Sequence, residues 1–134
     1  MPYIDTACEV DIAGHIRAVT AAAAEQAGRC SDDVIGTGPL PGTPEWEAEQ
    51  STATPAQRSI AWHLLSLRIQ VAAGLDGVET VVVLRVLGAP WAAIGRATGM
   101  SRQSAHERWG TRSRAVLDPV GSGLPSIVVD DDPR

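Results

Sequence analysis

The chain has 134 residues, of which 11 are basic and 16 acidic, so its formal net charge is −5. This length fits one domain and is enough to bury a core, whereas an acidic chain ordinarily argues against a nucleic acid as partner. The apolar run Val81–Leu84 is interrupted by Arg85, far short of the roughly 20 residues that a membrane-spanning helix needs. Residues 1–5 lack the basic and apolar segments of a signal peptide. We therefore expect a cytoplasmic protein with no membrane contact.

Residues 1–30 predict one N-terminal helix. Thr6 and Glu9 have the spacing of a capping box, in which each side chain accepts a hydrogen bond from the other residue's backbone N–H. Spacings of three and four residues then place one apolar stripe on the helix, made of Ile12, Ile16, Val19 and Ala23. Gly28 is the predicted end of this helix. We expect the helix to supply core and oligomer contacts.

Residues 31–53 are predicted to form a flexible linker, because Gly and Pro residues cluster between Gly36 and Pro44. A linker of this length is unusual in a compact domain. Trp46 lies among three glutamates, and we expect its ring to pack against the surface of the protein and so to hold part of this acidic segment in place.

The predicted helix from Thr54 to Ala73 has a distinct start. Thr54 is the predicted cap, Pro55 occupies the first helical position, and Gln57 completes a capping box. Its polar residues form a narrow strip made of Ser59, His63, Ser66 and Gln70. An apolar face this wide must be covered on more than one side. The helix is therefore either the centre of the core or half of a dimer interface, and His63 is expected to be a surface histidine.

Gly74 ends this helix, and Asp76 to Glu79 offer a further capping box. Residues 78–87 are rich in Val, which by propensity alone also allows a strand. The capping box and Gly88, a C-terminal stop, favour a helix.

The charges are unevenly distributed along the chain. Residues 85–114 contain six Arg and one Glu, a net charge of +5, so the remainder carries −10. The chain has no Lys, so every basic side chain is an Arg. The overall acidity therefore does not describe this segment, which has the charge expected of a nucleic-acid contact.

The same segment contains a specific pattern of small and capping residues. Gly95 is a small residue where two helices meeting at a steep angle need their backbones to approach. Gly99 tolerates the positive φ that the turn requires. Met100 is the apolar plug of the turn, and Ser101 caps the following helix. This helix is predicted to reach Gly110, with a short continuation, and to bury Ala105 and Trp109 together with Ile94 and Trp91.

Residues 90–110 resemble the helix-turn-helix of DNA-binding proteins from GC-rich bacteria, and are similar to sigma-factor region four and resolvase modules. The resemblance implies an all-α fold, with a helix-turn-helix domain at 54–117. It also implies that the helix starting at Ser101 enters the major groove of double-stranded DNA. Gly and Pro residues and a final run of three Asp predict a flexible acidic tail at 118–134.

The resemblance assigns two groups of DNA contacts. Bases are contacted from the start of the second helix, where Arg pairs with guanine and Gln with adenine, by Arg102, Gln103 and His106. Phosphates are contacted by a second group, consisting of Arg96, Ser101, Arg108, Arg112 and Arg114. One such helix gives a small interface, so a homodimer on a two-fold site is expected.

The sequence thus predicts a nucleoid-associated transcriptional regulator. The alternative is an adaptor that docks on polymerase, a sigma factor or another protein through the wide apolar face at 54–73 and the Trp46 segment. No cofactor, metal or catalytic residue is expected. Cys8, His15 and Cys30 match no known metal-ligand spacing, and the two cysteines are expected to be buried or half-buried free thiols.

Overall fold

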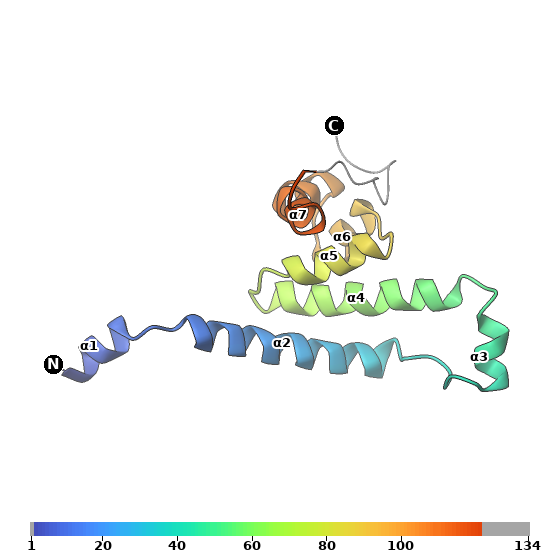
Figure 1. Ribbon diagram of the computed structural model, residues 1–134, viewed down its shortest axis with the longest axis horizontal. Coiled ribbons are helices and arrows are strands. Elements are labelled where there is room, and N and C mark those ends of the chain that lie inside the picture. Colours follow the sequence, from blue (N-terminus) through green and yellow to red (C-terminus); the bar gives the residue numbers. More distant parts are fainter. Residues whose placement is uncertain (1, 122–134) are drawn as a thin grey trace.

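The computed structural model describes residues 2–121, and this part of the chain is all-α, as predicted (Figure 1). The helices are α1 (Pro2–Glu9), α2 (Ala13–Val34), α3 (Pro44–Glu49), α4 (Thr54–Ala72), α5 (Val78–Val86), α6 (Trp91–Thr98) and α7 (Arg102–Leu117). None of these helices is both long and apolar enough to cross a membrane. Of the predicted tail 118–134, only residues 118–121 lie within the described residues.

α4 is the central helix of the fold, which decides between the two alternatives raised by its wide apolar face. It lies between α2 on one side and α5 to α7 on the other (Figure 1). The core on the second side consists of Leu67, Val81, Leu84, Ala89, Trp91, Ile94, Ala105 and Trp109. Burying a large apolar side chain contributes roughly 1.5–3 kcal/mol, so this cluster is the main source of stability for α4 to α7.

The N-terminal segment forms two helices, and the prediction of one helix capped at Thr6 is wrong. The Thr6 hydroxyl donates to the carbonyl of Pro2 at 2.8 Å, a bond made inside α1. The start of α2 is instead supported by Asp11, whose carboxylate accepts from the N–H of Ala13 at 3.1 Å. An Asp side chain that bonds the backbone two residues ahead favours a turn over a continuous helix.

The predicted apolar stripe on this segment lies at the surface. Ile12, Ile16 and Val19 are 52%, 54% and 65% exposed. The reason is that α1 and the first half of α2 extend past the end of α4, so no other element within residues 2–121 covers them (Figure 1). The prediction that this stripe supplies core contacts is therefore wrong for the single chain.

The second half of α2 packs on α4 through small residues. The prediction that Gly28 ends the helix is wrong. Gly28 lies buried inside α2, where the ring of Trp62 packs on its backbone. A Cβ at Gly28 would lie 3.1 Å from that ring. Ser31 is fully buried, and its hydroxyl lies 2.9 Å from both the carbonyl of Trp62 and the hydroxyl of Ser66. The two helices therefore approach closely through a hydrogen-bonded seam.

Packing of α4 against α2 and α5 also buries part of its predicted polar strip. Ser66 is 3% exposed and faces Ser31, and Gln70 is 7% exposed and donates to the hydroxyl of Thr80 at 3.0 Å. Buried polar groups are stable when they are hydrogen-bonded, and these side chains are. His63 is half-buried, so it is less exposed than the surface histidine that the sequence predicted.

The segment predicted as a linker, 31–53, contains helical structure at both ends of a loop. α2 continues to Val34, and α3 begins after Thr43, whose hydroxyl accepts from the N–H of Trp46 at 3.3 Å. α4 begins at Thr54 with Ala53 as its cap, so Thr54 is the first helical residue and not the cap. Pro55 consequently occupies the second helical position, where its missing N–H is also tolerated.

The Val-rich segment is a helix, as predicted, but its N-cap is Gly77 and not Asp76 of the expected capping box. The carboxylate of Asp76 accepts from the N–H of Val78 at 3.1 Å and so supports the start of α5. Gly74 and Gly88 have positive φ values of 85° and 89° and end α4 and α5. At Gly88 the backbone bonds close a Schellman motif, from Gly88 to Arg85 and from Ala89 to Leu84. Local signals at both ends thus outweigh the strand propensity of Val.

Candidate functional site

α6 and α7 are joined by a tight turn at the positions that the sequence predicted. Gly99 has a φ of 74°, and the N–H of Met100 bonds the carbonyl of Gly95 at 2.8 Å. The hydroxyl of Ser101 accepts from the N–H of Ser104 at 3.0 Å, which confirms Ser101 as the cap of α7. Met100 is half-buried and packs against the core.

Gly95 is the point of closest approach between α6 and the turn. A Cβ at this position would lie 2.7 Å from the carbonyl oxygen of Met100 and 2.9 Å from that of Ser101. Because both contacts are with backbone, a larger residue forces the turn to move.

We expect Gly95→Ala to lower the free energy of unfolding by about 1–3 kcal/mol, because an overpacked site must distort. This loss exceeds the ~1 kcal/mol that Ala favours over Gly inside a helix. Urea denaturation measures the difference. Gly14→Ala on α2 is the matched control, since a Cβ there meets nothing closer than 3.8 Å. A gain in stability for both variants would contradict the close approach at Gly95.

The inner face of α7 is fixed in the core as predicted. Ala105, Trp109 and Ile94 are fully buried, and Trp91 is 2% exposed. The indole N–H of Trp109 donates to the carbonyl of Asp76 at 3.0 Å, which ties α7 to the segment before α5. α7 does not end near Gly110 but continues to Leu117, and Gly110 makes room for the ring of His106, which lies 3.0 Å from the position of a Cβ.

The three predicted base-contacting residues differ in their surroundings. Arg102 and Gln103 are exposed at the start of α7. The side-chain amide of Gln103 donates to Glu107 at 2.9 Å. His106 is half-buried, and its ring meets Trp91 edge to face with 5.3 Å between ring centroids. The structure therefore brings Arg102 and Gln103 together at the surface and turns His106 toward the core, not outward as expected.

The predicted phosphate-contacting residues are all exposed. Arg96 lies on α6, Ser101 is the N-cap of α7, and Arg108, Arg112 and Arg114 lie on α7. Arg108 lies over the ring of Trp109, with 4.6 Å from the guanidinium carbon to the ring centroid. Arg112 is held by Asp76 through two hydrogen bonds of 2.7 and 3.0 Å. Arg108 and Arg112 are thus held in place by their neighbours.

The +5 charge of residues 85–114 is not all available to a ligand. Arg85 is 6% exposed, donates to the carbonyl of Ala89 at 3.0 Å, and lies over Trp91 at 4.6 Å. The Arg85 guanidinium therefore interacts with groups inside the core. The position of Arg85 in the sequence did not predict this burial. The exposed cations of the segment lie on α6 and α7.

Asp76 has a second role that the sequence did not indicate. The sequence predicted it only as part of a capping box, whereas its carboxylate also binds Arg112. Its hydrogen bonds with the Arg112 side chain are the main reason that its pKa lies below the ordinary value of 3.8, with further lowering by the N–H of Val78 and opposition from partial burial. No local signal pointed to this pair, because the two residues are 36 positions apart.

The lowered pKa of Asp76 predicts a pH dependence of folding. A carboxylate with a lower pKa in the folded state contributes stability above its unfolded pKa and loses it as the pH falls through the folded value. We therefore expect the free energy of unfolding to fall below about pH 4 less steeply in Asp76→Asn than in the wild type. Urea denaturation between pH 2.5 and pH 7 measures this slope. Asp33→Asn is the control, and equal slopes for all three proteins would argue against the Asp76–Arg112 contribution.

Within residues 2–121, no group of His, Cys, Asp or Glu side chains is placed to hold a metal ion. Cys30 is half-buried, as expected for a free thiol, but Cys8 is exposed on α1. Comparison of the chain with protein-family models, with curated proteins and with solved structures gave no significant match.

Proposed function

We propose that this protein is a sequence-specific double-stranded DNA-binding protein, a transcriptional regulator that reads the major groove with α7. The observation that supports this function most is that three features occur together at α6 and α7. A tight turn joins the two helices, one face of α7 is fixed in the core, and arginines line its exposed surface.

The start of α7 has suitable chemistry for reading bases. A guanidinium donates two bonds to guanine and a carboxamide pairs with adenine in the major groove, which are the groups of Arg102 and Gln103. Gln103 would exchange its bond with Glu107 for a base. Arg96, Arg108 and Arg114 would contact phosphates beside this position. His106, which packs on Trp91, would help to hold α7 in place.

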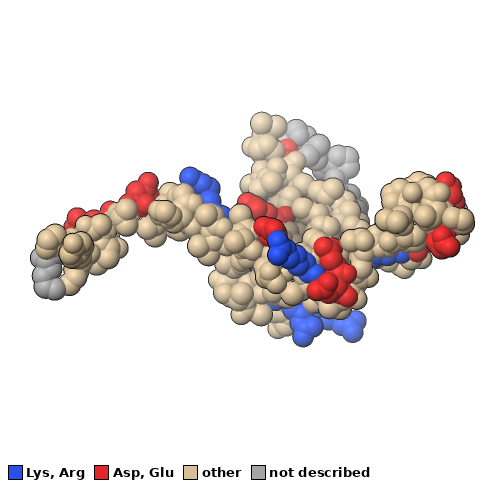
Figure 2. Space-filling model, turned by 90° about the horizontal axis from the view of Figure 1, so that it is seen from below, with Lys and Arg blue, Asp and Glu red and all other residues tan. Residues whose placement is uncertain are grey.

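Many acidic side chains lie away from α7, whereas Glu107 bonds Gln103 on α7 itself and Asp76 bonds Arg112. Figure 2 shows acidic side chains at both ends of the molecule, toward α1 and over α3, and further ones near the middle of the face in view. The first group includes Asp5, Glu9 and Asp11, and the second includes Glu45 and Glu47. The acidic ends would be repelled by a polyanion, which would help to orient the arginines of α7 toward it.

A homodimer fits this function, because a single α7 offers a small interface and two-fold sites are read by paired helices. The exposed apolar stripe of α2, formed by Ile12, Ile16 and Val19, would pack on a second copy of the chain. The alternative of an adaptor loses one support, since the wide apolar face of α4 is covered by α2 and α5 to α7.

The test is DNA binding by the wild-type chain on duplexes selected from a random library, measured by fluorescence anisotropy. Three to four phosphate contacts per chain, with two chains on one duplex, would weaken binding about 10³- to 10⁴-fold between 50 and 200 mM salt. Titration of duplex at concentrations well above Kd is expected to end at two chains per duplex. No binding at low salt would refute the proposal. Binding of a protein partner that is insensitive to salt would favour the adaptor.

A further inference from the structure

A cleft of about 560 Å³ lies at the end of the molecule opposite α1, where the loop after α2, α3 and the first half of α4 meet. Prolines form part of its walls. The walls also contain two indole rings, a histidine and three charged side chains, namely Trp46, Trp62, His63, Asp32, Glu49 and Arg58. This volume is within the range of small-molecule sites, roughly 300–1,000 Å³. The cleft shares no residue with the proposed DNA contacts.

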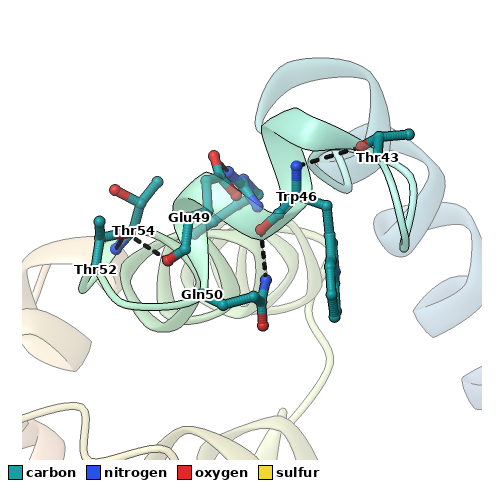
Figure 3. A network of polar contacts seen from close by, with 7 residues as sticks. Thr43, Trp46, Glu49, Gln50, Thr52 and Thr54 are labelled. Atoms are coloured by element: carbon teal, nitrogen blue, oxygen red, sulfur yellow. Dashed lines mark hydrogen bonds and ion pairs between the residues drawn. The ribbon is translucent and has the colours of Figure 1, made fainter.

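The two indole rings come from different elements, and hydrogen bonds hold the backbone of Trp46 and the ring of Trp62. Trp46 lies on α3, where Thr43 accepts from its N–H and the side chain of Gln50 donates to its carbonyl at 3.0 Å (Figure 3). Trp62 lies on α4, and its indole N–H donates to the carboxylate of Asp32 at 2.8 Å. Both rings are only half-buried, so aromatic surface remains open to the cleft.

The charges that line the cleft favour a cation. Arg58 pairs with Glu49, and its guanidinium also lies against the backbone of Gly38, where a Cβ would overlap it. The Arg58 charge is therefore balanced within the wall. Asp32 adds a second carboxylate, whose hydrogen-bond donor is the neutral indole of Trp62. Asp32, Glu49 and Arg58 together give the lining a formal charge of −1.

Indole faces attract cations through the negative charge of the ring face, and this attraction is strongest when the cation is partly removed from water. An anion would meet an arginine that is already paired, together with an additional carboxylate. We propose that this cleft binds an organic cation with an apolar body, such as an aromatic quaternary ammonium compound, between Trp46 and Trp62 and near Asp32. This site is independent of the proposed DNA-binding function.

The first experiment titrates the full chain with benzyltrimethylammonium and, separately, with benzenesulfonate, by isothermal titration calorimetry. We expect saturable binding of the cation with one site per chain, and much weaker binding of the anion. Equal affinity for the two probes would show a site that selects only an aromatic ring, and absence of cation binding would show no site. Either result would overturn the proposal.

The second experiment locates the site with variants. Asp32→Asn keeps an oxygen that accepts from the Trp62 indole but removes the charge, so cation binding is expected to weaken several-fold. Asp33→Asn removes the same charge from the neighbouring exposed residue, which does not line the cleft, and is expected to bind as the wild type does. Equal losses in the two variants would mean that only the overall charge matters.

Trp46→Ala removes one wall, and a loss of about three- to thirtyfold is expected from one cation–ring contact. Trp46→Phe keeps an aromatic face and should retain part of the affinity. Far-ultraviolet circular dichroism checks that each variant remains folded. Unchanged affinity in Trp46→Ala would contradict the assignment of the cation to this cleft.

Discussion

Replacing Trp109 by alanine is expected to lower the free energy of unfolding by about 3–5 kcal/mol, a large part of the stability of a small domain. The side chain is fully buried among the residues of α4, α5 and α6, so its removal leaves a cavity as well as lost apolar burial. Urea denaturation at neutral pH measures the loss.

Trp109→Phe separates packing from hydrogen bonding. Phenylalanine fills most of the space but cannot donate to the carbonyl of Asp76, which the indole N–H reaches at 3.0 Å. We expect an intermediate loss of about 1–3 kcal/mol, since one buried group loses its donor and some volume is lost. An alanine variant as stable as the phenylalanine variant would contradict the central position of this side chain.

Arg102→Ala and Gln103→Ala are expected to weaken binding to the selected DNA by about 1–3 kcal/mol each and to change which sequences are preferred. These effects rest on the proposed function. Both residues are exposed at the start of α7, where base edges would be reached. Anisotropy titrations on the selected duplex and on a scrambled duplex measure affinity and preference separately.

Arg68→Ala is the matched control, because Arg68 is exposed on α4 and its removal changes the net charge by the same amount. Arg112→Ala is expected to weaken all sequences alike, as a phosphate contact would, although Asp76 already holds this side chain. Equal losses of DNA affinity for Arg102→Ala and Arg68→Ala would mean that only the net charge of the chain matters. No loss for Arg102→Ala or Gln103→Ala would exclude α7 as the reading helix.

The part of the fold that the sequence predicted well is the part controlled by local signals. The positive φ of Gly99, the cap at Ser101 and the helix at 78–86 depend on neighbouring residues, so their patterns were sufficient. Burial of Ala105 and Trp109 followed from their spacing on one helix face.

The errors came from contacts between distant segments. Gly28 has the usual features of a helix end, and only the ring of Trp62, 34 positions away, explains why it lies inside α2. Ser66 was assigned to a polar strip because Ser31, which bonds it, is 35 positions away. The cleft at α3 had only the isolated Trp46 as a signal, since its walls come from three segments whose approach no local pattern describes.

Asp76 couples the start of α5 to the middle of α7. Its carbonyl holds the indole of Trp109, one carboxylate oxygen holds the N–H of Val78, and the carboxylate also binds Arg112. Local opening of the first turn of α5 would therefore release the middle of α7 at the same time. In native-state hydrogen exchange, the amides of these two segments would open as one unit, with a common free energy of opening, instead of fraying separately.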